Sequence, residues 1–271
     1  MLDHRVALEQ PLITNISMTP EAIRQYRPPG DLLQQRIVLI TGASEGIGKA
    51  AALAYAQHGA TVVLLAKELN KLEQVYDEIE KAGCPQPALY PMNLESATLK
   101  DYQDLAGTLE SEFGRLDGLL NNAGWVGGLT PLRHYDVERW AQVMTINLHA
   151  PFLLSKTCLA LLDRSDDPTI VFSTDACLRS YWGAYGIAKH AMEGLLAILA
   201  DELNGEKPIR VNGIDTGPVG TWMRKQNYPG EDPNTLPSPK QVIPAYLYFM
   251  GPDSRDVTGQ NLHLAEQSCQ P

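Results

Sequence analysis

The stretch LITGASEGIGKA, residues 39–50, decides the fold of this chain. It begins at the end of the apolar run 36–40 and opens a helical pattern, so we interpret it as a turn between a strand and a helix. Its glycines Gly42, Gly46 and Gly48 permit a tight turn and let backbone amides approach a pyrophosphate closely. The spacing GxxxGxG differs from the GxGxxG dinucleotide fingerprint, so a simple packing turn is the alternative interpretation.

The rest of the chain alternates apolar runs with helical patterns. Short apolar runs typical of buried parallel strands recur at 61–66, 116–120, 169–173 and 209–214. Helical patterns separate them, at 46–59, 69–83, 97–114, 136–163 and 184–203. This alternation predicts an α/β fold, a Rossmann-like doubly wound parallel sheet of about seven strands, in a single domain with helices on both faces.

Two segments do not follow this alternation. Residues 1–35 are proline-rich and aperiodic, so we interpret them as an N-terminal extension that wraps on the surface or is partly disordered. Residues 36–271 form the predicted dinucleotide-binding domain. Within it, residues 216–240 are long, proline-rich and aperiodic, which in a compact domain is more typical of a binding lid than of a connection.

Length, charge and composition limit the classes of function. The chain has 271 residues, enough to bury a full core, and its net charge of -10 argues against a nucleic acid or an anionic membrane as a partner. It contains no continuous run of about 18 apolar residues, so no membrane span is expected. Its four cysteines are scattered, which favours reduced thiols and a cytoplasmic location. His134, His149 and His190 do not cluster at ligand spacing, so no metal is expected.

Tyr185 and Lys189 lie four residues apart in the sequence YGIAK. On a helix this spacing puts both side chains on one face. Because the helix follows the strand predicted over 169–173, that face lies near the carboxyl end of the sheet, where open α/β folds bind ligands. The same strand ends with Ser173 and is followed closely by Asp175. Tyr185, Lys189 and Ser173 are the candidate catalytic groups of this segment, and either Ser173 or Asp175 stands opposite Tyr185.

Taken together, the motifs resemble the short-chain dehydrogenase/reductase family. They occur in the family's order along the chain, as TGASEGIG (41–48), NNAG (121–124), the asparagine of MTINLHAPF (Asn147), YGIAK (185–189) and RVNGIDTGPVGT (210–221). The resemblance covers roughly residues 36–265. Within the family, the segments WGAYGIAK, LADEL and VIPAYLYFMGPDSRDVTG are similar to those of the YciK-type bacterial oxidoreductases.

The resemblance implies a hydride-transfer site for a carbonyl or alcohol substrate. In such a site Tyr185 would be the general acid/base, and Lys189 would lower the pKa of the phenol and hold the nicotinamide ribose. Asn147 would anchor a water in the proton relay, and Ser173 would supply a hydroxyl. The implied cofactor contacts are Gly42, Ser44, Gly46, Ile47, Gly48, Lys67, Asn93, Leu94, Asn122, Ala123, Gly124, Tyr185, Lys189, Gly217, Val219 and Thr221.

The residue at the end of the second strand normally selects the cofactor. An acidic residue there binds the ribose hydroxyls of NAD, whereas a basic one meets the 2′-phosphate of NADP. Lys67 stands just past this strand end, which favours NADP, with NAD as the alternative. Glu45 and Glu68 oppose this interpretation because both would repel a phosphate, and Lys67 is equally interpreted as a solvated lysine.

The end of the strand before Tyr185 departs from the family pattern. When the strands are aligned, Asp175 takes the position of the family's serine and the loop to Tyr185 is shortened. Strand alternation would place Ser173 on the same side as Asp175, as the hydroxyl left on the catalytic side. A carboxylate beside Tyr185 would raise the phenol pKa. The alternative function is therefore a dinucleotide-binding protein with weak or lost catalysis, acting as a sensor or a partner-binding module.

The helix predicted over 136–163 is apolar on more than one face. In the resemblance, this helix and the one that carries Tyr185 pack against a second subunit, so a homodimer or homotetramer is expected. A core helix buried within the monomer is the alternative.

Overall fold

Strands β1 to β7 form one sheet in which each neighbouring pair is parallel. The computed structural model describes residues 18–265, and within them the seven strands follow the order β3-β2-β1-β4-β5-β6-β7. Their bounds are β1 Ile37–Thr41, β2 Thr61–Ala66, β3 Ala88–Pro91, β4 Gly118–Asn121, β5 Thr169–Thr174, β6 Arg210–Asp215 and β7 Asn261–His263. The predicted doubly wound parallel sheet is confirmed.

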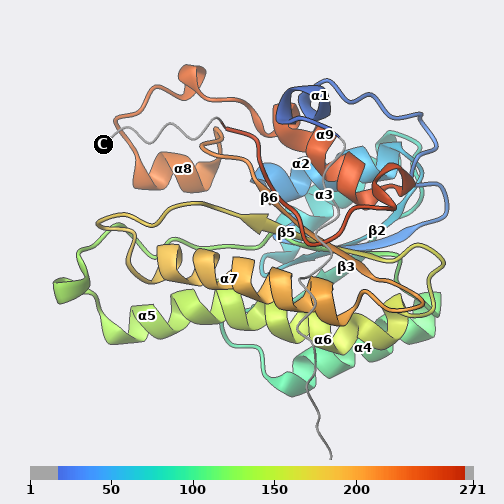
Figure 1. Ribbon diagram of the computed structural model, residues 1–271, viewed down its shortest axis with the longest axis horizontal. Coiled ribbons are helices and arrows are strands. Elements are labelled where there is room, and N and C mark those ends of the chain that lie inside the picture. Colours follow the sequence, from blue (N-terminus) through green and yellow to red (C-terminus); the bar gives the residue numbers. More distant parts are fainter. Residues whose placement is uncertain (1–17, 266–271) are drawn as a thin grey trace, which may run out of the picture.

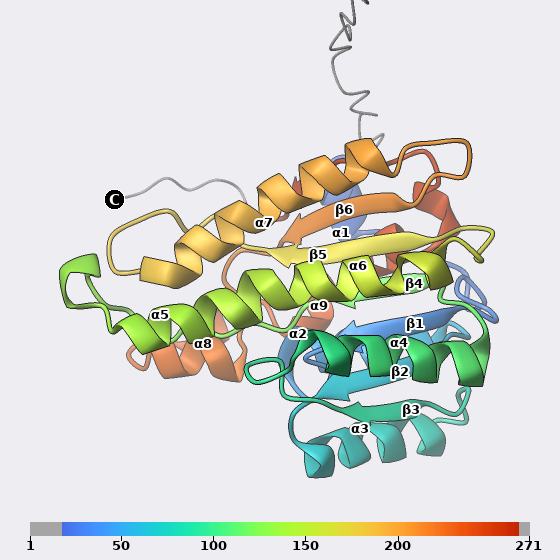
Figure 2. The ribbon, with the colours of Figure 1, turned by 90° about the horizontal axis from the view of Figure 1, so that it is seen from below.

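Helices cover both faces of the sheet (Figures 1 and 2). One face carries α2 (Gly46–Gln57), α3 (Leu69–Lys81) and α9 (Pro239–Met250), and the other carries α4 (Leu99–Phe113), α6 (Ala150–Leu162) and α7 (Gly183–Glu202). Side chains of β1 alternate between these layers, because successive residues of a strand point to opposite faces. Val38 and Ile40 join the core under α2 and α9, whereas Leu39 joins the core under α4, α6 and α7.

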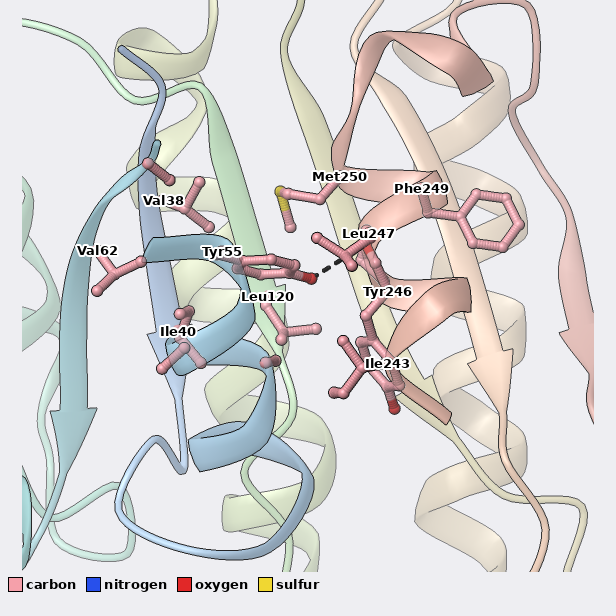
Figure 3. Packing of buried hydrophobic residues seen from close by; sticks show 14 of the residues in the cluster. Val38, Ile40, Tyr55, Val62, Leu120, Ile243, Tyr246, Leu247, Phe249 and Met250 are labelled. Carbon is pink, nitrogen blue, oxygen red and sulfur yellow. Dashed lines mark hydrogen bonds between the residues drawn. The ribbon is translucent and has the colours of Figure 1, made fainter. Parts of the chain in front are cut away.

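The first of these cores joins α2 to α9. Figure 3 shows Tyr55 of α2 between strand residues such as Ile40 and the apolar side chains of α9. Its hydroxyl donates a hydrogen bond to the carbonyl of Tyr246 at 3.2 Å, so the polar end of this fully buried ring is satisfied. Burying one such side chain contributes about 1.5–3 kcal/mol. The contact fixes α9, and with it the Tyr246 side chain, relative to the glycine turn.

The strand order reverses between β1 and β4, and this switch point is where open α/β sheets bind ligands. Thr41, the last residue of β1, lies at this switch point. Its hydroxyl accepts hydrogen bonds from the amides of Asn122 and Ala123, both at 3.0 Å, and donates to the carbonyl of Leu120 at 3.2 Å. The predicted NNAG segment is thereby fixed beside the end of β1.

The single helix predicted over 136–163 is interrupted. The structure has α5 (Val137–Met144), a π-helical segment Thr145–His149 and α6. The combined run Val137–Leu162 has the length and mean hydropathy of a possible membrane span, a test that core helices also pass. Residues of α6 such as Leu154 and Leu162 are buried against the sheet with α4 and α7.

The described part of the predicted extension packs on the domain. Helix α1 (Pro20–Arg24) lies against α9, with Ile23 and Leu33 fully buried. The hydroxyl of Tyr26 donates to Asp253 at 2.7 Å, and its ring meets Tyr248 edge-on. Residues 1–17 of the extension and 266–271 at the other end lie outside the described residues.

The predicted lid, residues 216–240, contains regular structure. Helix α8 (Trp222–Asn227) and a short 3₁₀ helix (Pro233–Thr235) lie within it, and its last two residues already belong to α9. Arg224 of α8 pairs bidentately with Glu231, with both N–O distances at 2.7 Å. The segment therefore has an internal scaffold and differs from the aperiodic loop that its sequence suggested.

Candidate active site

The glycine turn between β1 and α2 has the geometry of a phosphate cradle. Gly42 and Gly46 have φ angles of 65° and 57°, in the left-handed region that favours glycine. A Cβ at Gly48 would collide with the Gly42 carbonyl and the Asn122 amide, so only glycine fits there. The Glu45 side chain makes no cap hydrogen bond, which leaves the first amides of α2 without a side-chain cap and facing the crevice. The turn fits a pyrophosphate group.

Predicted cofactor residues from distant parts of the chain meet around this turn. A Cβ built on Gly46 would lie 3.4 Å from Cγ2 of Thr221, the N-cap residue of α8. A Cβ built on Gly124 would lie 3.0 Å from Oδ1 of Asn147 and 3.7 Å from Nζ of Lys189. Because Gly42 also lies against Asn122 and Ala123, the segment 122–124 runs from the glycine turn to Asn147 and Lys189. Thr221 uses its hydroxyl to accept the Arg224 amide at the start of α8, at 3.2 Å.

The π-helical segment positions Asn147. The side chain is fully buried, and its Nδ2 donates to the carbonyls of Trp125 and Val143, each at 2.8 Å. Its Oδ1 accepts the Trp125 amide at 3.2 Å. Widening one turn re-aims a side chain, and such segments occur frequently at functional sites. Asn147 thus binds the loop that follows β4.

Tyr185 and Lys189 lie on one face of α7 as the spacing predicted, and each is only 3% exposed. The phenol of Tyr185 donates to Oδ2 of Asp175 at 3.1 Å. Nζ of Lys189 donates to the carbonyl of Ser173 at 2.6 Å and lies 5.7 Å from the centre of the Tyr185 ring. The acid/base candidate is therefore held between a lysine and a carboxyl group.

Burial controls the protonation of this cluster. It is the largest cause of a Tyr185 pKa well above the ordinary tyrosine value, and Asp175 raises that pKa further. Burial also raises the pKa of Asp175, with Asp215 as the next cause. The pKa of Lys189 is lowered by burial, against the opposing effect of Asp175. Each group is shifted toward its neutral form.

The hydroxyl of Ser173 lies away from Tyr185, which corrects the expectation that it shares a side with Asp175. It donates to Oδ1 of Asn122 at 3.2 Å and lies 3.0 Å from the hydroxyl of Tyr246, on the α9 side of the sheet. The strand β5 ends at Thr174, so Asp175 lies beyond the pleat and the alternation of side chains does not extend to it. Ser173 contacts Lys189 through its backbone carbonyl.

Lys67 follows the end of β2 and is exposed. It forms no ion pair within residues 18–265. The two carboxylates that oppose a phosphate here are both engaged by Lys71, whose Nζ lies 3.5 Å from Glu45 and 3.1 Å from Glu68. Lys71 therefore offsets their repulsion, and the end of β2 is less acidic than the sequence suggested.

The other predicted cofactor residues surround the same end of the sheet. Asn93 follows β3 and is exposed, whereas Leu94 is buried in the core under α4. Gly217 and Val219 follow β6, and Val219 is buried. Ser44 and Ile47 belong to the glycine turn and are half-buried.

Sequence reasoning missed Asp215. This last residue of β6 is buried, and its carboxylate accepts the amides of Gly217 at 2.9 Å and Ala176 at 3.2 Å. Nδ1 of His263 lies 3.0 Å from Oδ2 of Asp215. The available signal was a carboxylate at the carboxyl end of a predicted strand, where open α/β folds bind ligands.

A glycine turn at the switch point of a doubly wound sheet, with a buried tyrosine–lysine pair beside it, defines a dinucleotide-dependent oxidoreductase architecture. The model of the short chain dehydrogenase family matches residues 36–232, and the chain belongs to this family. The expected family is thereby confirmed.

Individual relatives agree with this assignment. The oxidoreductase YciK of Escherichia coli (strain K12) is 41% identical over 237 residues, which cover 86% of this chain and 93% of YciK. A short chain dehydrogenase structure from Pseudomonas syringae is 48% identical with a TM-score of 0.86, and the match covers 89% of this chain and 98% of that one. A short chain dehydrogenase from Escherichia coli CFT073, crystallised with NADPH, is 41% identical with a TM-score of 0.85, covering 88% and 100% of the two chains.

Proposed function

We propose that this protein is an NADP(H)-dependent oxidoreductase that interconverts a carbonyl and an alcohol, with Tyr185 as the group that exchanges a proton with the substrate oxygen. The observation that carries this proposal is the placement of Lys189 beside Gly124 and 5.7 Å from the Tyr185 ring, in a segment whose Asn122 and Ala123 lie against Gly42 of the glycine turn. A substrate oxygen next to the phenol would then lie next to the nicotinamide end of a dinucleotide bound along this segment.

The chain's own residues would bind and orient the cofactor and protonate the substrate oxygen. The amides at the start of α2 would hold the pyrophosphate, and Lys189 would hold the nicotinamide ribose and add positive charge beside Tyr185. Asn147 keeps the loop after β4 in place. When bound, the cofactor supplies the hydride chemistry. Burial of Tyr185 and Lys189 excludes bulk water from the proton transfer.

A preference for NADP over NAD is supported by Lys67 and by one relative. Lys67 stands after β2, where the 2′-phosphate of NADP would lie, and Lys71 is already paired with Glu45 and Glu68. The similar enzyme from Escherichia coli CFT073 was crystallised with NADPH. A phosphate at this position would meet a cation that has no competing ion pair within residues 18–265.

Two further properties belong to the proposal. Apolar side chains exposed on α6 and α7, namely Phe152, Ile187 and Ile198, support a homo-oligomeric interface on these helices. The cytoplasmic location predicted from the cysteines stays a prediction.

The test is a cofactor titration followed by a substrate screen. NADPH and NADH binding is measured by fluorescence, and carbonyl compounds are then screened with wild type and Tyr185→Phe. We expect tight NADPH binding by both proteins and turnover only by wild type. The matched control is Tyr181→Phe, because Tyr181 is exposed on the loop before α7. This variant should keep full activity. Turnover that survives in Tyr185→Phe would disprove the role of Tyr185.

A further inference from the structure

Asp175 lies beside Tyr185 but has no role in the proposed function described above. Charged and titratable groups face it from every neighbouring element. Tyr185 and Lys189 approach from α7, Cys177 from the loop between β5 and α7, Asp215 from the end of β6 and Arg224 from α8. The phenol of Tyr185 donates directly to its Oδ2 at 3.1 Å. Asp175 therefore touches the atom that would exchange a proton with the substrate.

Tyr185 by itself is a poor base in this environment. A phenolate would be buried and would lie beside the Asp175 carboxyl, so both burial and negative charge disfavour it. Lys189 offers a compensating charge, but its Nζ is bonded to the carbonyl of Ser173 and its own charged form is disfavoured by burial. A reaction that never requires a free phenolate avoids this problem.

The two carboxyl groups near Tyr185 have different partners. Asp215 accepts two backbone amides and lies beside Nδ1 of His263, so donors surround its negative charge. Asp175 has no comparable set of backbone donors to its carboxyl among the described residues, and the phenol is its main side-chain partner. Burial and the neighbouring Asp215 both raise the pKa of Asp175, and so favour its protonated form relative to an ordinary aspartate.

We propose that Asp175 is a further catalytic residue and that it stores the proton that Tyr185 delivers. This inference rests on the proposed function. In carbonyl reduction, the Asp175 O–H bond breaks as its proton passes to the Tyr185 oxygen, and the phenolic O–H bond breaks as that proton passes to the substrate oxygen. The electron pair arrives as the hydride of the proposed cofactor. Tyr185 ends neutral and Asp175 ends as a carboxylate, which takes up a proton from solvent before the next turnover.

The direction of the reaction then depends on the protonation of Asp175. Reduction needs the protonated carboxyl, so kcat/KM for reduction falls about tenfold per pH unit above the pKa of Asp175. Oxidation of an alcohol runs the same transfers backward and needs the carboxylate, so its rate falls as the pH drops below that pKa. A simple phenol mechanism predicts instead that Asp175 hinders the reaction.

Two variants separate these accounts in an assay of NADPH-dependent carbonyl reduction. Asp175→Asn keeps the shape of the side chain but has no ionisable proton, and Asp175→Ser removes the carboxyl group altogether. We expect both to bind NADPH as wild type does, to lose about 100-fold or more in kcat/KM, and to lose the pH dependence assigned to Asp175. Asp201→Asn, an exposed residue of the same helix α7, is the matched control. A rate for Asp175→Ser that equals or exceeds wild type near neutral pH would overturn the proposal.

A second measurement needs no substrate and no cofactor. The carboxyl carbons of aspartate are labelled with ¹³C in the full chain, and the Asp175 signal is assigned from Asp175→Asn. We expect Asp175 to titrate above the ordinary value of 3.8, and higher still in Tyr185→Phe, because the phenol's hydrogen bond favours the carboxylate. Titration at or below 3.8, or no response to Tyr185→Phe, overturns the proposal. If wild type reduces no carbonyl, the proposed function fails while this titration still decides whether Asp175 and Tyr185 share a proton.

Discussion

Asn147 and the backbone of Trp125 form a reciprocal pair of hydrogen bonds. Nδ2 of Asn147 donates to the Trp125 carbonyl at 2.8 Å, and its Oδ1 accepts the Trp125 amide at 3.2 Å. The pair joins the π-helical segment 145–149 to the loop after β4, and so sets the distance between Gly124 and Lys189. A residue expected to hold a water thus has a prior structural role in shaping the crevice.

Replacing Asn147 by leucine should therefore affect stability as well as activity. The substitution preserves much of the volume but leaves the amide and carbonyl of Trp125 without their partners. A buried polar group without a partner costs about 1–3 kcal/mol, and we expect the free energy of unfolding to fall by that amount in urea titrations. His149→Ala, at an exposed position of the same segment, is the control and should be nearly neutral. Equal stability of Asn147→Leu and wild type would contradict the structural role.

Gly48 offers a test of the phosphate cradle. A methyl group there meets the Gly42 carbonyl and the Asn122 amide, neither of which is a flexible chain end. We expect Gly48→Ala to lower the free energy of unfolding by about 1–3 kcal/mol and to weaken NADPH binding. The same substitution at Gly107, an exposed helical position with no atom within 4 Å of the new methyl, should raise stability by about 0.5–1 kcal/mol. Normal NADPH binding by Gly48→Ala would show that the turn does not hold the phosphate.

The sheet and the tyrosine–lysine pair were predictable because each depends on a local pattern. Apolar runs such as 61–66 coincide with buried strands, since a parallel strand covered on both faces needs an apolar residue at nearly every position. Tyr185 and Lys189 share a face because helical spacing alone places them there. The glycine turn was recognisable from its position between strand and helix.

The features that were not predictable depend on contacts between distant segments or on the exact residue at which a strand ends. The π-helical segment around Asn147 has no sequence signature of its own. Because β5 ends at Thr174, Asp175 does not share the side of Ser173, which faces α9, and strand ends are the least certain part of a sequence-based assignment. The link between Asp215 and His263 exists only because β6 and β7 are neighbours in the sheet.

Lys67 should determine the preference for NADPH. If it meets the 2′-phosphate, Lys67→Ala removes one charge-assisted hydrogen bond, which contributes about 1.5 kcal/mol or more, so NADPH binding should weaken about tenfold. NADH lacks this phosphate and its dissociation constant should not change. Lys81→Ala, an exposed lysine at the end of α3, serves as the control for a general loss of positive charge. Equal weakening of NADPH and NADH would contradict the role of Lys67.

The carboxyl of Asp175 should lower the stability of the folded protein at neutral pH. Burial, followed by the charge of Asp215, raises its pKa in the folded state above the ordinary value of 3.8. The folded state therefore binds the proton more tightly than the unfolded chain does, and ionisation above the folded pKa favours unfolding. Below the unfolded pKa the carboxyl is protonated in both states and this effect disappears. Asp175→Asn, which keeps an acceptor for the Tyr185 phenol, should be more stable than wild type at neutral pH.

Urea titrations of both proteins between neutral pH and about pH 4 measure this difference. The advantage of Asp175→Asn should shrink steadily as the pH falls through the folded pKa of Asp175, and it should be absent from Asp201→Asn at every pH. If Asp175→Asn is instead less stable at neutral pH and equals wild type at low pH, the carboxylate is favoured by the fold. Its pKa would then be lowered, and Asp175 could not store the proton for carbonyl reduction at neutral pH.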